Sequence, residues 1–508
     1  MSELFWASYL RFAGNLLHAV PTLFIGFLIA AVFAQVMRRD NVQKLFGERG
    51  LRSLAQAWLI GMLLPVCALG VLPVLREMRR QGVSAGAMLA FGLTAPLFNP
   101  ISVLYGLTLS NPWVILLFCL GSLVIVAVAG TAWNWLFGLY EVQCEQPAPV
   151  APGYKRILSM IWYIAREMTG PTMVFVLFGL LGVTLLGLVL PFGSLQFAAE
   201  ADDPLAPAVM GAVSILAYSS PIQVMVLVAG MFEHGNSAGA AFSLLVLGAG
   251  LNLATIVWLV VTYGWRPSLI WLAMFCAVTI SLAYTLDKPL FPAGVSPAGH
   301  THAFDDFCFP FSETETNPRR AALYQLASKS EVYEYVFLRA AVICGLGGLA
   351  IRLLRLQERL ESWLAAGEFS RSRYDPYLPS WLLWISSLGG LVAFSIAGCF
   401  LYYPPPEDVL SELRQAETAL ASAALSRDYE VALHWVGVTE SWMHKLAVGT
   451  RLRGQTRTPY QEAKANLLLE KLELLEHAVK RRDAEQTPKL GLATQRAGIR
   501  LRNAMRGK

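Results

Sequence analysis

A single cysteine lies in an apolar run that two prolines and a glycine interrupt. The run reads PVCALGVLP from Pro65 to Pro73 and contains Cys67 and Gly70. Proline has no amide hydrogen and loosens a helix, so nearby carbonyls need partners outside the helix. A thiolate suits soft metals or trivalent arsenic, whereas most membrane cysteines only fill apolar space. The run therefore suggests ligand binding at a broken helix.

A second stretch, Tyr218 to Leu253, matches Pro65 to Pro100 at a constant offset of 153 residues. Eight of the 36 positions are identical, and they cluster, because GxSAGA recurs and Asn99 matches Asn252. We interpret the match as two structural repeats, a common way to build a transporter. The candidate substrate-pathway residues are Cys67, Gly70, Pro73, Asn99, Ser219, Ser220, Gln223 and Asn252. The alternative is that these Asn and Ser side chains only hold helices together.

Two further patterns contain side chains that could catalyse a reaction or bind a metal. Residues Gly82 to Gly86 fit the G-x-S-x-G pattern of hydrolases. However, the pattern opens an apolar helix and recurs at Gly235. We therefore expect Ser84 and Ser237 to cap helices. A metal site is a speculative interpretation of the loop that contains His300, His302, Asp305 and Cys308. Their spacing fits no known ligand pattern, and a solvated loop is the alternative.

Several classes of function are not supported. The chain has no Walker pattern, so ATP-driven catalysis is not expected, and we expect no cofactor and no enzyme activity. Nucleic-acid binding has no support either, since membrane topology explains where the basic residues lie.

Composition identifies the elements that must position these residues. Of 508 residues, 55% are hydrophobic and 15% are charged, which predicts an all-α, polytopic membrane protein. Apolar stretches of about 20 residues can cross the hydrocarbon core. They lie near 14–36, 54–75, 85–109, 112–139, 171–192, 205–232, 237–263, 267–286, 335–354 and 381–402.

The loop charges favour inverted repeats. If 54–75 and 205–232 are re-entrant, one side of the membrane holds 17 loop Lys and Arg, and the other side holds five. If both segments cross, the repeats are parallel and the charges divide evenly. Because cytoplasmic loops are enriched in Lys and Arg, the positive-inside rule favours the re-entrant arrangement.

These observations divide the chain into six parts. We expect a first transmembrane repeat (1–140), a linker (141–170), a second repeat (171–286), an extramembrane loop (287–334), a helix pair (335–403) and a soluble helical domain (404–508). In the last part, apolar residues recur at helical spacing, as in Val409, Leu413, Ala416 and Leu420, which predicts a small antiparallel bundle.

The Pro65–Pro73 run, the following Gly82-x-Ser84-x-Gly86 and Pro96-x-x-Asn99-Pro100 resemble the ArsP-like predicted permease family. The resemblance covers about residues 10–286. That family is known for a P-x-C-x-C-G-x-x-P segment and two related halves, and some members export trivalent organoarsenicals through cysteines. Cys67 matches the first family cysteine, but Leu69 stands in place of the second. The resemblance thus implies a permease more strongly than it implies arsenic.

We therefore expect a multi-pass permease of a bacterial inner membrane. It would move a small solute, such as a metalloid or organic compound, between two pseudo-symmetric halves. The partners expected are the lipid bilayer, the small-molecule solute and a protein that binds residues 404–508. The alternative is a membrane scaffold or sensor whose helical tail binds a partner.

Overall fold

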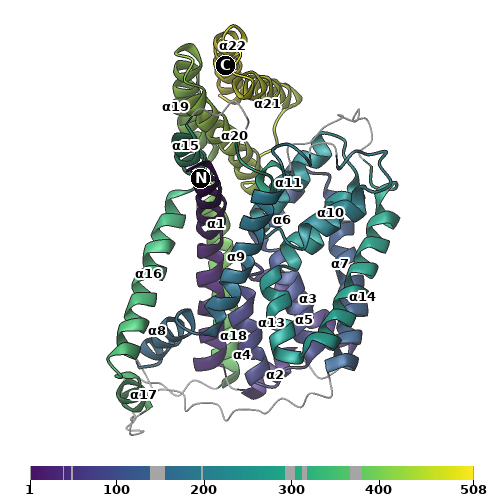
Figure 1. Cartoon of the computed structure of the whole chain (residues 1–508), viewed down its shortest axis with the longest axis vertical. Helices are drawn as coiled ribbons and strands as arrows, with labels where there is room; N and C mark the ends of the chain where they lie inside the picture. The colour runs from purple at the N-terminus through teal and green to yellow at the C-terminus, as the bar shows by residue number, and fades with distance from the viewer. Residues whose placement is uncertain are drawn as a thin grey trace.

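The computed structural model describes residues 2–37, 39–46, 50–137, 155–195, 198–291, 304–311, 317–365 and 380–506. Over these residues the chain is all-helical, as predicted. Figure 1 shows an upright bundle with the C-terminal helices at its upper end. We call the ends of the bundle the lower face and the upper face, as they are drawn there.

Five described helices are long and apolar enough to cross a membrane. They are α1 (Ser2–Gln35), α7 (Pro112–Phe137), α9 (Pro171–Val189), α14 (Trp265–Asp287) and α16 (Val332–Leu353). Three bent helix pairs would raise the number of spans to eight. Two of these pairs are α5 (Ala85–Leu97) with α6 (Pro100–Leu109), and α12 (Ala238–Ser243) and η1 (Leu244–Gly250) with α13 (Leu253–Tyr263). The third joins α18 (Ser380–Tyr402) to α19 (Pro406–Leu425).

The first interrupted segment folds back on itself. Helix α3 (Leu51–Leu63) begins beside the short α2 (Arg39–Phe46), where the Ser53 hydroxyl donates to Phe46 O. Residues 64–70 break the helix, and α4 (Val71–Arg80) follows. Gln81, just after α4, donates to Phe33 O near the end of α1 and accepts from Gln43 of α2. Both ends of this first hairpin thus lie at the lower face.

The second interrupted segment enters from the opposite end. Helix α10 (Ala206–Ser214) is followed by a break at residues 215–220 and by α11 (Pro221–Glu233). Tyr284, near the end of α14, donates to Pro204 O before α10. Just after α11, Ser237 donates through its amide to Ala199 O and through its hydroxyl to Asp287. Both ends of this second hairpin lie at the upper face.

The predicted spans 85–109 and 237–263 are not straight helices. The chain bends by 50° between α5 and α6 and by 54° between η1 and α13. The first bend has a direct cause, because Pro96 has no amide hydrogen and Pro100 can only start a new helix. The bends lie at Phe98–Asn99 and at Leu251–Asn252, which are equivalent under the 153-residue offset.

Other equivalent residues make equivalent contacts. Asn134 of α7 accepts from the amide of Gly86 at 2.6 Å, and Asp287 of α14 accepts from the amide of Gly239 at 2.8 Å. Gly82 and Gly235, which precede these helices, both have positive φ, a conformation that glycine adopts without steric cost. The two-repeat interpretation remains a prediction that these matched contacts support.

Close backbone contact seats the first break against α1. A Cβ added at Gly26 would lie 1.9 Å from Gly70 O, and one added at Gly70 would lie 2.5 Å from Thr22 O. Only glycine allows this approach on both sides. The first break is therefore fixed against α1 by backbone packing.

The C-terminal helices form a separate core and dock on the upper face. Helices α19, α20 (Tyr429–Leu452), α21 (Pro459–Lys480) and α22 (Gln486–Met505) bury one apolar cluster, which includes Val409, Leu413 and Leu420. Helix α20 packs on α15 (Pro318–Lys329) and on α6. Arg451 donates to Leu107 O, and the His444 ring lies edge-on to Tyr105, with 5.6 Å between centroids. The bundle therefore contacts the outer end of a bent span.

The close contact at Gly26 gives a stability prediction. In Gly26→Ala the new methyl group meets the backbone of the first break, which cannot move without breaking its packing. We expect a loss of at least about 2 kcal/mol, seen as a lower thermal midpoint of the purified protein in detergent. Gly14→Ala on the same helix is the control, since its new Cβ meets only Leu326 Cδ1, at 3.8 Å. Equal midpoints for the two variants would contradict the packing.

Docking of the tail predicts a pH effect. Burial lowers the pKa of His444 to about 4, whereas an exposed histidine titrates near 6.5. The unfolded chain therefore binds the extra proton first, so stability is lost as pH falls from about 6.5 toward 4. Between pH 7 and pH 5 this one group accounts for a loss of about 2 kcal/mol.

We expect His444→Phe to lose less thermal stability than wild type over that pH range. Thermal unfolding at pH 7 and pH 5 measures the difference. His434→Phe is the control, because the His434 ring lies on the same helix and bonds to Tyr324 O. The same acid sensitivity in wild type and His444→Phe would contradict the burial of a neutral His444.

Candidate functional site

The two breaks and the bend before α13 meet around α9. A Cβ added at Gly179 would lie 2.6 Å from Leu69 Cδ2 in the first break and 3.0 Å from Ala254 Cβ in the first turn of α13. One turn further along α9, a Cβ at Gly182 would lie 3.1 Å from Leu253 and 3.3 Å from Leu216 O in the second break. The small residues of α9 thus let three broken elements approach one another.

Two more contacts complete this cluster. A Cβ at Gly250 would lie 3.2 Å from Leu97 Cδ2, so the end of η1 packs against the end of α5. Tyr218 of the second break lies near Cys67 of the first, although its hydroxyl makes no hydrogen bond within the described residues. We call residues 64–70, 98–99, 215–220 and 251–252 the four-break junction.

Polar side chains cap three of the helices that begin at the junction. Asn99 accepts from Ser102 N at 2.8 Å before α6, and Asn252 accepts from Thr255 N at 3.0 Å before α13. Ser220 accepts from Gln223 N at 3.3 Å before α11. An N-cap of this kind is worth about 1 kcal/mol. These predicted pathway residues therefore have a structural role as well.

The first break has fewer polar groups. Cys67 Sγ accepts from Gly70 N at 3.3 Å, and Gly70 is the N-cap of α4. Pro73 lies in the first turn of α4, where its missing amide costs no helical hydrogen bond. Cys67, Gly70 and Pro73 are all buried.

Three buried polar atoms at the junction have no hydrogen-bond partner within the described ranges. They are Tyr218 Oη, Ser219 Oγ and Asn252 Nδ2, and all three residues are 0% exposed. Such atoms cost free energy unless something pairs with them. Six of the predicted pathway residues therefore lie at the junction, namely Cys67, Gly70, Asn99, Ser219, Ser220 and Asn252.

Gln223 turns away from the junction toward the upper face. Its Nε2 donates to Asp306 at 3.2 Å, and Asp306 also pairs with Lys329 and, at 3.6 Å, with Arg11 of α1. Although burial alone would raise it, the pKa of Asp306 is lowered by the Lys329 and Arg11 cations. Arg11 also donates to Asp305 O. We call this group the upper clasp, because it ties α11 to α1.

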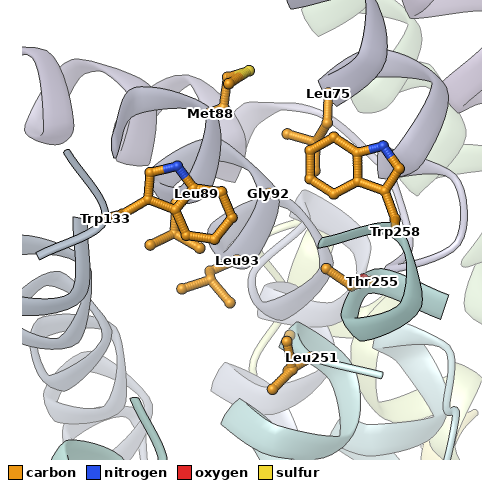
Figure 2. A pocket seen from close by; sticks show the side chains of 10 residues that line it. Leu75, Met88, Leu89, Gly92, Leu93, Trp133, Leu251, Thr255 and Trp258 are labelled. Carbon is orange, nitrogen blue, oxygen red and sulfur yellow. The ribbon is translucent and has the colours of Figure 1, made fainter. Parts of the chain in front are cut away.

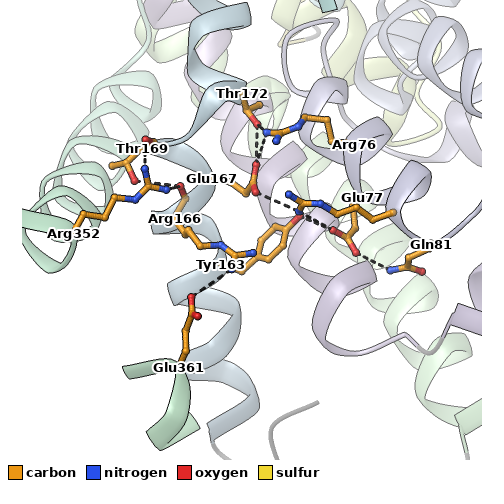
Figure 3. Close-up of polar contacts among 11 residues, drawn as sticks. Arg76, Glu77, Gln81, Tyr163, Arg166, Glu167, Thr169, Thr172, Arg352 and Glu361 are labelled. Atoms are coloured by element: carbon orange, nitrogen blue, oxygen red, sulfur yellow. Dashed lines mark hydrogen bonds and ion pairs between the residues drawn. The ribbon is translucent and has the colours of Figure 1, made fainter. Parts of the chain in front are cut away.

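A second buried charge network ties the first hairpin at the lower face (Figure 3). Arg76 of α4 donates to Glu167 of α8 (Lys155–Met168) at 2.8 Å and also to Thr172 of α9. Tyr163 donates to Glu77 at 3.0 Å. Removing one partner of a buried pair costs more than the pair contributes, because a charge is left unpaired. This lower clasp was not predicted from the sequence.

A small apolar pocket adjoins the junction (Figure 2). Leu251 and Thr255, on either side of the α13 cap, line it, and the Trp133 and Trp258 indoles flank it. The other lining residues are Leu75, Met88, Leu89, Gly92, Leu93 and Gly250, so both halves of the chain contribute. The pocket lies between α5 and α13.

The speculative metal set is only partly described. His300 and His302 lie outside the described residues. Asp305 pairs with Lys480 at 3.4 Å, and Cys308 O accepts from Arg11. Among the described residues, no group of three His, Cys, Asp or Glu side chains could hold a metal ion. The metal site stays a prediction.

Some residues that pack against the junction or make matched contacts in the two halves were missed. Gly26 and Gly179 are related by the same 153-residue offset as Asn99 and Asn252, and both glycines contact the first break. The pair of Asn134 and Asp287 also shows that offset. Extending the repeat comparison beyond Pro65–Pro100 would have found them.

Comparison with known proteins gives a family match for part of the chain. Residues 7–147 match the model of the ArsP_1 family, which is described as a predicted permease. This segment includes the first hairpin and the α5–α6 bend. No solved structure matches the chain.

Two curated relatives align over similar lengths. The UPF0718 protein YcgR of Bacillus subtilis (strain 168) is 26% identical over 129 residues, which are 25% of this chain and 44% of the relative. A putative two-component membrane permease complex subunit of Streptococcus mutans serotype c (strain ATCC 700610 / UA159) is 24% identical over 120 residues, 23% of this chain and 40% of the relative. The chain thus spans less than half the length of either relative.

These matches test the resemblance that was based on the Pro65–Pro100 stretch. Both the family model and the Bacillus relative support it. Residues 7–147 are therefore similar to the ArsP_1 family of predicted permeases, in agreement with that resemblance.

Proposed function

We propose that the chain is a membrane permease that moves a small solute through the four-break junction. The observation that carries this proposal is the meeting of two hairpins from opposite faces at buried, unpartnered polar atoms. Many transporters place their site near the bilayer midplane, between broken helices of two repeats. The family match supports a permease and specifies no solute.

The clasps suggest how access alternates. The lower clasp holds α4 near its outer end, and the upper clasp holds α11 near its start. Each clasp thus ties one hairpin to its neighbouring helices. Opening one clasp would free one hairpin to move while the other stays seated, which is the rocking or gating motion typical of repeat-based transporters.

The solute need not be a metalloid. Leu69 packs into the space beside Gly179, where the resemblance would place a second thiol near Cys67. Tyr218 faces Cys67 from the second break. A single thiol does not chelate as a pair does, so this arrangement favours a solute held by hydrogen bonds.

We place the protein in the inner membrane of a bacterial cell, with the lower face toward the cytoplasm. The Lys and Arg distribution supports this orientation. The C-terminal bundle would then lie outside the cytoplasm. We propose no catalytic step, because the junction brings together no nucleophile and base pair among the described residues.

The alternative function is a scaffold or sensor whose tail binds a protein. One relative is named as a subunit of a membrane permease complex, which favours a protein partner for that relative. In this chain the tail already contacts α6 and α15. A tail-binding partner would therefore act on the membrane helices directly.

Substitution of the N-cap residues at the junction tests the proposed function. Asn99→Ala and Asn252→Ala each remove a cap at the junction, and we expect each to lower uptake by proteoliposomes at least tenfold. The solute is chosen from a radiolabelled panel of metalloids, organic acids and neutral compounds that the wild type carries. The stability cost is that of one lost cap, about 1 kcal/mol.

Ser84→Ala is the matched control. It removes a similar cap at the outer end of a helix, where Ser84 accepts from Ala87 N. We expect comparable thermal midpoints in all three variants and near wild-type uptake in the control. If no panel solute crosses with the wild type, the permease proposal is wrong.

A further inference from the structure

Four helices begin at the four-break junction. They are α4, α6, α11 and α13, and each has at least ten residues. A helix N-terminus carries partial positive charge and unpaired amide hydrogens, so it favours an anion. The 17 junction residues themselves contain no Asp, Glu, Lys or Arg, so backbone dipoles dominate the local field.

Four helices also end at the junction, and their carbonyls would favour a cation. The α3 carbonyl of Leu63 is already used, because it accepts from Ser395 of α18 at 3.2 Å. At the second break, Leu216 O lies against α9. A cation would also lack a carboxylate from the junction residues. The N-termini are therefore the more available ends.

Side-chain atoms that have no hydrogen-bond partner at the junction also favour an anion over a cation. The Oδ1 of Asn252 is fixed by the amide hydrogen of Thr255, so Nδ2 is the remaining atom and can only donate. As the N-cap side chain, Asn252 folds over the start of α13, which places Nδ2 at that N-terminus. Ser219 precedes the cap of α11 and has a free hydroxyl within the described structure. Two helix N-termini thus each have an unused donor beside them.

The same chain already holds a carboxylate at a helix start. Asp287 accepts from Gly239 N at 2.8 Å and from the Ser237 hydroxyl at 2.7 Å, at the beginning of α12. One amide and one hydroxyl pair with that carboxylate. The junction offers a similar donor set, namely backbone amides, the Ser219 hydroxyl and the Asn252 amide, without a carboxylate of its own.

We propose that the junction binds a small oxyanion at the N-termini of α11 and α13, with hydrogen bonds from Ser219 Oγ and Asn252 Nδ2. The inference rests on the proposed permease function, for which it names the substrate class. The anion is small because the adjoining pocket is narrow and its remaining walls are apolar, including Leu251 and Trp258. Such a site needs no cationic side chain, since amides and dipoles provide the positive field.

Aspartate at position 252 tests the inference most sharply. Asn252→Asp keeps a good N-cap but places a fixed negative charge where the anion would bind. We expect this variant to lose the anion response while its thermal midpoint stays at or above that of wild type. Asn252→Ala and Ser219→Ala should weaken apparent anion affinity about tenfold each, the effect of one lost hydrogen bond to a charged group.

The probes are sulfate, phosphate, nitrate and acetate, with glycerol and urea as neutral comparisons. Thermal unfolding of the full chain in detergent measures binding, and radiolabelled uptake by proteoliposomes measures transport. At least one anion should raise the wild-type midpoint by about 3 °C or more near saturation. Ser84→Asp is the control, because it adds the same charge at an outer cap and should keep the anion response.

Two results would overturn the inference. One is a wild-type protein whose midpoint no anion shifts, and the other is an Asn252→Asp variant that responds to anions as wild type does. Junction-dependent uptake of neutral solutes alone would reject the anion and leave the permease standing. An anion that stabilises the wild type but not Asn252→Asp, with no solute crossing the bilayer, would support the site and reject the permease.

Discussion

Burial of broken helix ends is the constraint on which the rest of this structure depends. Inside hydrocarbon, each free amide and carbonyl needs a partner, because water is absent. N-cap side chains such as Asn99 and Asn252 satisfy some of these amides. Glycines such as Gly26 and Gly70 let the first break pack closely against α1. The breaks can therefore persist at the centre of the bundle.

The charges are placed where this constraint is weakest. The Arg76–Glu167 pair lies near the lower face and the Arg11–Asp306 pair near the upper face. Each network binds one hairpin to neighbouring helices, while the junction between them has no ionisable acid or base except Cys67 and Tyr218. Fixed charge thus lies toward the two faces of the bundle, and helix dipoles and hydrogen bonds lie between them.

Much of the architecture could be predicted because it depends on local composition. Long apolar runs predict spans, and the Pro–Gly interruptions predict the breaks at residues 64–70. The bend before α13 was harder to predict, since Leu251–Asn252 contains no proline. The partners of Gln223 and Asp305 were unpredictable as well, because they come from distant elements, namely Asp306 and Lys480. Cys67 was assigned a soft-ligand role from its type alone, whereas its contact with Tyr218 depends on how the hairpins meet.

Site-directed labelling of single cysteines tests the central claim that two hairpins enter from opposite faces. Arg52→Cys and Arg79→Cys mark the ends of the first hairpin, and Leu205→Cys and His234→Cys mark the ends of the second. In a background without native cysteines, a membrane-impermeant maleimide should label the first pair from one side and the second pair from the other. Labelling of Arg52→Cys and Arg79→Cys from opposite sides would show that the first segment crosses the membrane, and would contradict the account.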